Sequence, residues 1–136
     1  MKLRIIEQGK NRVSATLNES GCCEVLDFLA TAPSNYQSSA KGFKSLFQRY
    51  AQGGRQMLTD ATFHEASREN DIWEFIKGQL RIYCFKDSNG QVVILSHGII
   101  KKSQKAKKQD IERAVTLREQ YLKAKDNGTL EEINNE

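Results

Sequence analysis

Hydrophobic and polar positions alternate most clearly in the middle of the chain, between residues 72 and 102. Three runs there are rich in β-branched and aromatic residues, which are enriched in strands. The runs are Ile72 to Ile76, Leu80 to Phe85 and Val92 to Ile100. Lys77-Gly78-Gln79 and Asn89-Gly90 separate them, and glycine and asparagine tolerate the positive φ of tight hairpin turns. The pattern therefore predicts three antiparallel strands joined by two tight turns.

The two faces of this predicted sheet differ in polarity. Pairing of the first two strands about Gly78-Gln79 places Glu74 opposite Tyr83, and side chains alternate between the faces. One face then carries Trp73, Phe75, Leu80, Ile82 and Cys84, and the other carries Glu74, Arg81 and Tyr83. We expect the first face to pack on the helices that precede the sheet. A charged residue in the middle of the second face needs either a partner or a function.

Three segments outside the sheet have the periodicity of an amphipathic helix, with apolar residues three and four positions apart. They are residues 22–30, residues 36–52 and residues 107–125. Their apolar stripes are Cys22, Val25, Leu26 and Leu29, then Phe43, Leu46, Phe47 and Tyr50, and finally Ile111, Ala114, Val115, Leu117, Arg118 and Leu122. Pro33 separates the first two helices, which we expect to form a hairpin. Residues 55–70 have no clear period and are interpreted as an ordered connection.

Two short segments at the start of the chain, Lys2 to Glu7 and Arg12 to Leu17, resemble the strands of an opening hairpin. The predicted fold class is therefore α+β, an antiparallel sheet with an N-terminal helical hairpin packed on one face and a C-terminal helix. A chain of 136 residues is expected to form one domain. Residues 1–19 are interpreted as an N-terminal addition, and the acidic residues 126–136 as a frayed tail.

Charge is distributed unevenly along this chain, whose formal net charge is +4. Residues 101–125 contain nine basic and three acidic side chains, whereas residues 126–136 contain four acidic and no basic ones. Clustered Lys and Arg indicate a polyanion partner, with a solvated helix face as the equal alternative. The run from Lys101 to Lys108 also leads into the start of a helix, where anions are bound favourably.

Several classes of protein and site are not expected. No apolar run approaches the roughly eighteen residues of a membrane span, and residues 1–10 lack a signal-peptide core, so a cytoplasmic protein is predicted. Cys22, Cys23 and Cys84 lack metal-ligand spacing and are interpreted as reduced thiols. The hydrolase, P-loop and dinucleotide-binding motifs are missing, as are carboxylate clusters for two metals. Cleavage of a phosphodiester would therefore proceed without a metal or other cofactor.

The polar face of the sheet offers the most chemistry. Glu74, Arg81 and Tyr83 form either a cross-strand ion pair beside a tyrosine, which is common and weak, or a phosphate site. In the second case the guanidinium forks to two phosphate oxygens and the ring stacks on a base or bonds to a reacting oxygen.

The alternation of polar and apolar positions does not indicate a catalytic role for either histidine, His64 or His97. His97 has the unperturbed pKa of a general base, but an even-length hairpin about Asn89-Gly90 aligns it with Ile82 on the core face. His97 is therefore interpreted as structural, unless a β-bulge reverses its orientation. His64 lies in the unpatterned connection and supports no role.

Several motifs recur together in one known family. Ile72-Trp73-Glu74-Phe75 and Leu80-Arg81 are followed by His97-Gly98-Ile99-Ile100-Lys101-Lys102-Ser103-Gln104-Lys105 and by Ile111-Glu112-Arg113-Ala114. Over about residues 22–122 the chain resembles the HigB-like, phage-derived branch of the RelE/ParE toxin superfamily. That branch has a Leu-Trp-Glu-Leu-Arg strand, an aromatic-Arg pair, a His-Gly-Phe-x-Lys-Lys-x-x-Lys-x-Pro run and an Ile-Glu-x-Ala helix.

Three departures from that pattern affect the expected site. Ile76 stands where the branch usually has arginine, Ile99 replaces phenylalanine and Lys107 replaces proline. Lys77 follows directly and could supply the lost charge, although its parity places it on the other face of the sheet unless the turn twists it round.

The resemblance implies the toxin of a type II toxin-antitoxin pair, an endoribonuclease that cuts messenger RNA in the ribosomal decoding site without a metal. The ribose 2′-oxygen attacks the adjacent phosphate, leaving a cyclic phosphate and a 5′-hydroxyl. Arg81 would stabilise the transition state, Tyr83 would orient or stack the base, and Lys101 or Lys102 would transfer a proton or act as a second cation. The implied RNA-binding residues are Lys77, Gln104, Lys105, Lys107 and Lys108.

The partners implied are the ribosome with its messenger RNA and a small helix-turn-helix antitoxin that binds DNA and masks the active face; no membrane is expected. Two alternatives stay open. A ParE-like toxin of the same fold acts on DNA gyrase by protein contact and needs no catalytic residues, so the departure at Ile76 favours it, whereas the basic run favours RNA. The third is an inactive RNA-binding or structural domain of phage origin.

Overall fold

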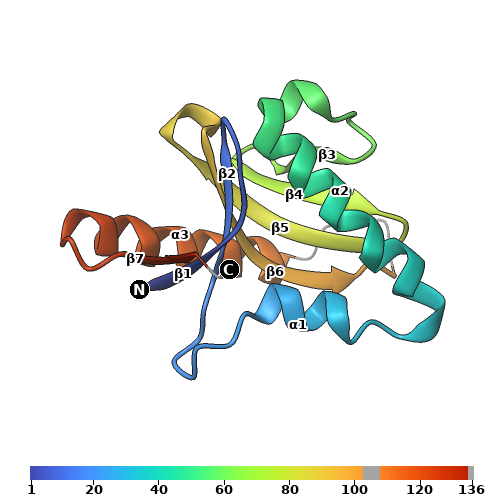
Figure 1. Ribbon diagram of the computed structural model, residues 1–136, viewed down its shortest axis with the longest axis horizontal. Coiled ribbons are helices and arrows are strands. Elements are labelled where there is room, and N and C mark those ends of the chain that lie inside the picture. Colours follow the sequence, from blue (N-terminus) through green and yellow to red (C-terminus); the bar gives the residue numbers. More distant parts are fainter. Residues whose placement is uncertain (103–107, 135–136) are drawn as a thin grey trace.

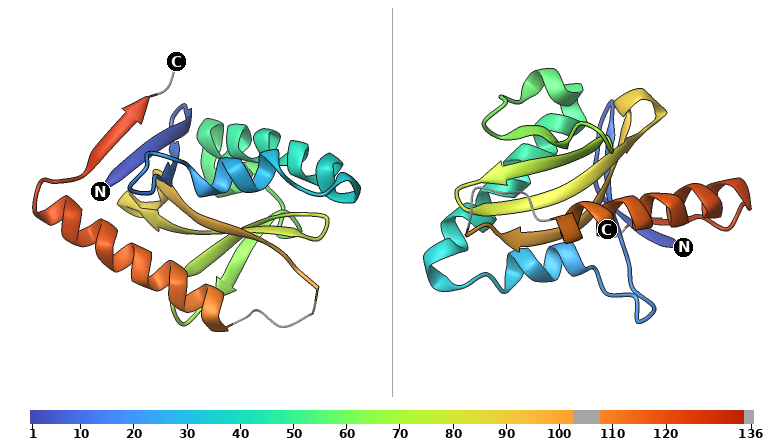
Figure 2. Two further views of the ribbon diagram at one scale, coloured as in Figure 1. Left: turned by 90° about the horizontal axis from the view of Figure 1, so that it is seen from below. Right: turned by 180° about the vertical axis from the view of Figure 1, so that it is seen from behind.

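The computed structural model describes residues 1–102 and 108–134, and this part of the chain forms a mixed α/β fold with helices on both faces of one sheet (Figures 1 and 2). The seven strands follow the order β3-β4-β5-β6-β2-β1-β7 across the sheet. They are β1 (Lys2–Gln8), β2 (Arg12–Thr16), β3 (Phe63–Ser67), β4 (Ile72–Lys77), β5 (Leu80–Asp87), β6 (Val92–Ile100) and β7 (Glu131–Asn134). The helices are α1 (Glu24–Ala30), α2 (Gln37–Gly53) and α3 (Lys108–Asp126), with short 3-10 turns η1 (Ser34–Tyr36), η2 (Gly54–Met57) and η3 (Ser88–Gly90).

The predicted three-stranded meander is confirmed as β4, β5 and β6. Glu74 pairs with Tyr83 across β4 and β5 as the alternation predicted, and Ile76 pairs with Arg81. Gly78 in the first turn has a φ of 57°, and Asn89 in the second has a φ of 58°. The second connection, η3, is longer than the predicted two-residue turn, because Asp87 is the last β5 residue to pair with β6.

The apolar face of the meander packs under α1 and α2, which confirms the predicted orientation of the sheet. Trp73, Phe75, Leu80 and Ile82 are buried in one cluster with the apolar stripe of α2, and the Phe47 ring meets the Phe75 ring edge-on at 5.1 Å between centroids. The predicted helical hairpin is not what forms. The first helix, α1, spans only seven residues and lies mainly on β6, while α2 lies on β1, β2 and β4.

The opposite face of the sheet is covered by α3 (Figure 2) and holds a second apolar core. Tyr83, Phe85 and Ile94 are buried there together with Ile111 and Tyr121 of α3. The predicted apolar stripe of α3 is therefore rotated slightly, because Tyr121 is buried while Leu122 is 44% exposed. This face is polar toward both ends: Glu74 and Arg81 lie at one end, and at the other Asp87 of β5 accepts hydrogen bonds from Tyr121 and Lys125 of α3.

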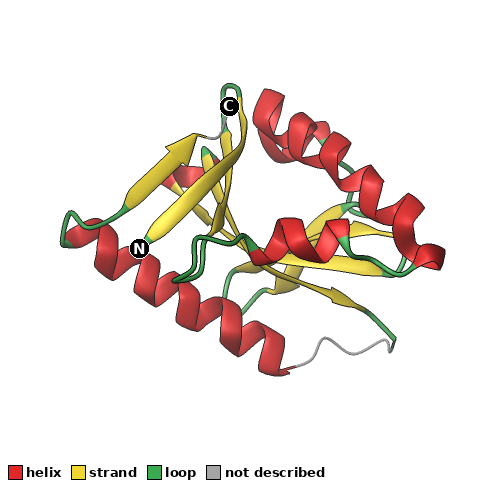
Figure 3. Cartoon of the chain, turned by 60° about the horizontal axis from the view of Figure 1, so that its bottom comes forward, coloured by secondary structure: helices red, strands yellow, loops and turns green. Residues whose placement is uncertain are grey.

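The sheet is mixed rather than purely antiparallel, which corrects the predicted architecture. The opening hairpin forms as expected from β1 and β2, but β2 pairs in parallel with β6 and β1 pairs in parallel with β7. The prediction of a frayed tail does not hold for residues 131–134, which form β7 at the edge of the sheet (Figure 3). There Glu132 forms an ion pair with Arg12 of β2, with Oε1 2.9 Å from Nη2.

Residues 55–70 contain a strand that the sequence pattern did not reveal. β3 pairs antiparallel with β4, and its register shifts by one residue between Glu65 and Ser67. Phe63 anchors the strand, because it is buried and its ring stacks on Trp73 with centroids 5.0 Å apart. Phe63 is the only buried residue of β3, which explains why the segment lacked a visible period.

Two expectations about the chain as a whole concern membranes and thiols. In the described part of the chain, no helix combines the length and the apolar character needed to cross a membrane. Cys22, Cys23 and Cys84 are free, with Cys22 exposed and the other two buried. Burial raises the pKa of the Cys23 and Cys84 thiols, so both remain protonated and unreactive.

Candidate functional site

A buried carboxylate, Glu74, organises the polar end of the sheet. Glu74 lies on β4, between β3 and β5, and is only 3% exposed. Its Oε2 is 3.0 Å from Nε2 of His64 on β3, and its Oε1 is 3.4 Å from Nε of Arg81 on β5. Three neighbouring strands thus bring one acidic and two basic side chains together on one face. A carboxylate buried this deeply needs such partners to remain charged.

His64 is held at both ring nitrogens. Nδ1 lies 2.9 Å from the carbonyl oxygen of Asp60, and Nε2 faces the Glu74 carboxylate. Both neighbouring oxygen atoms can accept a hydrogen bond from the ring. Glu74 thus lies between the His64 ring and the Arg81 guanidinium. The sequence analysis did not predict β3 and therefore did not predict a role for His64. The pairing of His64 with Glu74 across β3 and β4 would have revealed it, but no sequence motif indicates that pairing.

Arg81 is partly enclosed at the turn between β4 and β5. Its side chain is 16% exposed, and Nη1 donates to the carbonyl oxygens of Gly78 at 2.8 Å and Leu80 at 3.0 Å. The contact between Nε and Glu74 is an ion pair without hydrogen-bond geometry. Among the described residues, Nε of Arg81 and Oε1 of Glu74 therefore have no hydrogen-bond partner.

Tyr83 lies beside this pair and is completely buried. Its hydroxyl also has no hydrogen-bond partner in the described part of the chain. Burial, followed by the nearby charge of Glu74, raises the pKa of Tyr83 to about 12, so the phenol stays protonated at neutral pH. Three adjacent residues, Glu74, Arg81 and Tyr83, thus each keep a buried polar atom with unused hydrogen-bonding capacity. Such atoms are rare in folded proteins, and each calls for an explanation such as a catalytic role, stored strain or a bound water or ion. Arg12 Nε, Ser14 Oγ and Glu132 Oε2 are further atoms of this kind, away from the site.

His97 lies on this same face, which corrects the prediction that it faces the core with Ile82. The register of β5 and β6 shifts between Tyr83 and Cys84, so Ser96 is an extra residue and His97 pairs with Tyr83. The bulge that would reverse the orientation of His97 is therefore present. The Tyr83 and His97 rings are 5.3 Å apart between centroids.

The polar contacts of His97 tie the sheet to α3. Nδ1 is 2.8 Å from Oγ of Ser96, and Nε2 is 2.9 Å from Oδ1 of Asp110 in the first turn of α3. Burial lowers the pKa of His97, and the bond to Asp110 offsets this only in part. The ring is therefore neutral near pH 7, donating from Nε2 to the carboxylate and accepting at Nδ1.

Lys101 and Lys102, two of the lysines predicted for the site, lie apart from a third, Lys77. The backbone N–H of Lys101 donates to Gln79 at 2.7 Å, so β6 delivers Lys101 and Lys102 beside the turn that carries Arg81. Lys77 follows its predicted parity: its stem lies against Gly42 of α2, on the other face of the sheet. It therefore does not replace the arginine expected at Ile76.

Of the remaining predicted RNA-binding residues, the structure describes only Lys108, the first residue of α3. Lys108 is exposed and its Nζ is 3.9 Å from Glu112. Gln104, Lys105 and Lys107 lie outside the described residues. Within residues 1–102 and 108–134, no three His, Cys, Asp or Glu side chains gather closely enough to hold a metal ion.

Comparison with known families places this site in context. A family model described as Phage derived protein Gp49-like matches residues 27–119, more than half of the 136-residue chain. The chain belongs to this family. The Gp49-like family is toxin-like and of the RelE/ParE type, which confirms the resemblance at the level of the superfamily. A search of curated proteins gave no match.

The Gp49-like match has a clear structural extent. It runs from within α1 to within α3 and includes every residue of the polar site. The strands β1, β2 and β7 lie outside it. The hairpin and the edge strand are thus features of this chain in addition to the matched Gp49-like region.

Proposed function

We propose that this Gp49-like protein is the toxin of a type II toxin-antitoxin pair, of the HigB-like kind, and that it cleaves messenger RNA at the ribosome. The observation that carries this proposal is the set of three buried polar atoms, on Glu74, Arg81 and Tyr83, that have no hydrogen-bond partner among the described residues and lie beside the strand end that delivers Lys101 and Lys102. A preorganised cation and hydrogen-bond donors at one point of a sheet suit a phosphoryl group whose charge grows during reaction.

The proposed chemistry is transesterification of RNA. The ribose 2′-oxygen attacks the adjacent phosphorus, the 2′-hydroxyl proton passes to a base, and the bond to the 5′-oxygen breaks as that oxygen takes up a proton. A 2′,3′-cyclic phosphate and a 5′-hydroxyl result. Arg81 binds the phosphate, exchanging its ion pair with Glu74 for the more highly charged group. Lys101 or Lys102 transfers a proton or adds a second cation, and the proposal assigns no role to a metal.

The other residues of the site support this chemistry in different ways. His64, held on Glu74 at 3.0 Å, fixes the carboxylate that positions Arg81. Stacking of Tyr83 on a base stays a prediction, and it requires that the covered ring becomes accessible. The proposed partners are the ribosome with its messenger RNA and a helix-turn-helix antitoxin that masks the active face.

One observation favours a second candidate function, contact with DNA gyrase by a ParE-like surface. Arg81 already donates twice through Nη1 to the carbonyls of its own turn, and Ile76 stands beside it on β4 in place of arginine. A site with one engaged arginine has less capacity for transition-state binding.

The decisive experiment adds purified protein to translating ribosomes and maps the 5′ ends of messenger fragments. The wild type should produce cuts, and Arg81→Ala should lower the cleavage rate about a hundredfold, the usual scale for one preorganised donor. Arg49→Ala, which removes an exposed arginine from α2, is the matched control and should cleave normally. Growth arrest that persists in Arg81→Ala, with no messenger cleavage by either protein, would refute the nuclease and favour gyrase.

A further inference from the structure

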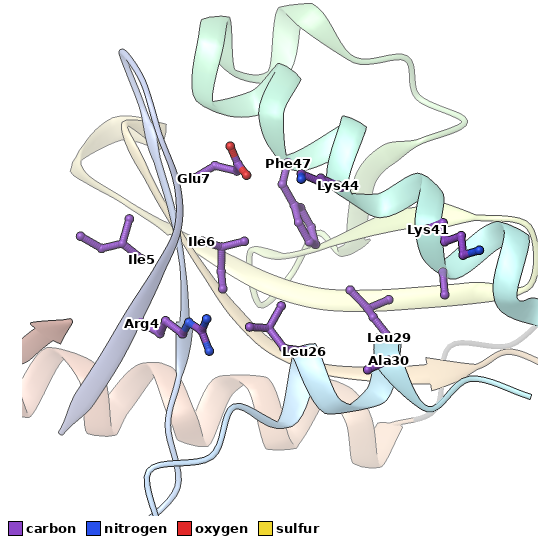
Figure 4. Close-up of a pocket in the computed structure, with 11 residues that line it drawn as sticks. Arg4, Ile5, Ile6, Glu7, Leu26, Leu29, Ala30, Lys41, Lys44 and Phe47 are labelled. Carbon is purple, nitrogen blue, oxygen red and sulfur yellow. The ribbon is translucent and has the colours of Figure 1, made fainter. Parts of the chain in front are cut away.

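A groove of about 630 Å³ lies between β1, α1 and α2 (Figure 4). It is on the α1/α2 side of the sheet, opposite the face that carries Glu74 and Arg81. Its volume falls within the range of protein ligand pockets, about 300–1,000 Å³. Ile6, Leu26 and Leu29 face the groove and pack on the main core while remaining only partly buried.

The groove results from the way the opening hairpin is attached. The hairpin tip is tied to the end of α2, where the Asn11 N–H donates to Ala51 at 2.9 Å, and α1 lies on β6. The register of β1 shifts between Ile5 and Glu7, so Ile6 points into the space between these elements, as does Arg4, while Ile5 points away (Figure 4). No described segment fills that space.

The charges around the apolar floor are mostly positive and lie on two sides. Arg4 projects from β1, and Lys41 and Lys44, one helical turn apart, project from α2 on the other side (Figure 4). None of the three forms an ion pair with a described residue. Among the described residues, Glu7 is the only acidic one that lines the groove. A complementary occupant carries negative charges on both sides of an apolar stripe.

The backbone around the groove restricts the form of that occupant. β1 is hydrogen-bonded to β2 on one side and to β7 on the other, so an extended segment cannot add to it as a further strand. A fatty acid carries one anionic head and would leave cations on one side unmatched. An amphipathic helix presents an apolar stripe with acidic residues on both flanks and satisfies its own backbone.

We propose that this groove binds an amphipathic helix of a partner protein, with apolar residues at i, i+3 or i+4, and i+7, flanked on both sides by Asp or Glu. Leu26, Leu29 and Ile6 receive the apolar residues, and Arg4, Lys41 and Lys44 pair with the acids. The site needs β1, which lies outside the Gp49-like match, so it belongs to this chain's own additions. The proposal does not depend on the chemistry of the opposite face.

The test uses a fluorescent, lactam-stapled helical peptide of about fourteen residues, roughly four turns, with Leu at the stripe positions and Glu on the flanks. Binding is measured by fluorescence anisotropy. Lys41→Glu/Lys44→Glu changes two exposed residues and should weaken binding by at least roughly tenfold. A peptide with Lys in place of Glu should bind Lys41→Glu/Lys44→Glu more tightly than the wild type, because the complementary charges are exchanged.

Two controls separate specific docking from general electrostatic attraction. Lys10→Glu/Lys123→Glu makes the same change in net charge at exposed positions away from the groove and should leave binding within about twofold, as screening predicts. A peptide of the same composition with a scrambled apolar stripe should bind far more weakly. Amide chemical shifts of labelled protein should change at Arg4, Ile6, Leu26 and Leu29.

Three results would overturn the proposal. One is equal affinity of the acidic peptide for the wild type and Lys41→Glu/Lys44→Glu. The second is tighter binding of decanoate at the same residues with displacement of the peptide, which would identify a site for an anionic amphiphile. The third is dimerisation of the protein in sedimentation experiments that the groove variant abolishes, which would identify a second copy as the occupant.

Discussion

Tyr83 lies against His97 across β5 and β6, with ring centroids 5.3 Å apart, and the contact exists because one extra residue bulges out of β6. Without that bulge His97 would point into the core under α1 and α2. With it, the imidazole connects the polar end of the sheet to Asp110 in α3. The position of the candidate site under the start of α3 therefore depends on a single irregularity of strand pairing.

Two buried tyrosines on this face should respond oppositely to loss of their hydroxyl. Tyr83 has no hydrogen-bond partner among the described residues, so Tyr83→Phe should leave the free energy of unfolding unchanged or raise it by up to about 1 kcal/mol. Tyr121 donates to Asp87 at 2.6 Å, so Tyr121→Phe should cost about 1.5–3 kcal/mol. Urea unfolding measures both. A clear destabilisation by Tyr83→Phe would show that its hydroxyl does have a partner.

The pH dependence of stability should reveal His97. Burial holds its pKa below the ordinary value of 6.5 in the folded state, so protons bind the unfolded chain more readily. The stabilisation is complete above about pH 6.5 and is lost as the pH falls below it, by at most about 1.4 kcal/mol per pH unit. Urea unfolding midpoints at pH 7.5 and pH 5 are compared for the wild type and for His97→Gln, whose side chain does not titrate in this range. Identical slopes in the two proteins would contradict this account.

Two glycines at crowded positions form a matched pair for testing how α1 and α2 pack. A Cβ at Gly98 would collide with the ring of Phe28, so Gly98→Ala should destabilise the protein by about 1–3 kcal/mol. A Cβ at Gly42 would come 2.7 Å from Cε of Lys77, a flexible stem that can move. Gly42→Ala in the middle of α2 should therefore be neutral or stabilising by up to about 1 kcal/mol. Thermal unfolding of both variants is the measurement, and equal losses would show that α1 does not rest on β6.

The basic strand end should dominate binding to RNA. Lys101→Glu/Lys102→Glu should weaken binding to ribosomes or single-stranded RNA and flatten its dependence on salt, because each phosphate contact releases condensed counterions. Lys10→Glu/Lys123→Glu carries the same charge change at other exposed positions and should retain the wild-type slope. Affinity measured at several salt concentrations decides the matter, and parallel slopes in all three proteins would mean that Lys101 and Lys102 are merely solvated.

The sequence was informative wherever alternation was strong. The three central strands and the orientation of Trp73 and Phe75 follow from side-chain parity, which local chemistry encodes. β3 was not predicted because the segment from Phe63 to Ser67 has one buried apolar residue. Its strand conformation is stabilised by pairing with the neighbouring strand β4. β7 was not predicted because its acidic composition is typical of a solvent-exposed tail. In the structure Glu132 instead forms an ion pair with Arg12 at 2.9 Å.

In the candidate site too, the residues that side-chain alternation places were predicted, and those that depend on the pairing between strands were not. Arg81 and Tyr83 were predictable because they share a face with Glu74 on two adjacent strands. His64 was not, since it reaches Glu74 only through the pairing of β3 with β4. The orientation of His97 depended on whether β6 contains a bulge, and a bulge is a property of the hydrogen-bonded ladder that the amino-acid sequence of one strand does not specify.

The parallel pairing of β2 with β6 has a consequence for how the molecule assembles. Arg12 lies beside Val92 in the sheet, so the first hairpin to leave the ribosome finds its place only after nearly the whole sheet has been synthesised. Contacts of such long sequence separation are costly in chain entropy and form slowly. The central meander, with its short turns, should collapse first and serve as the template. The hairpin, and with it the cationic groove and the edge strand β7, should be acquired in the final step of folding.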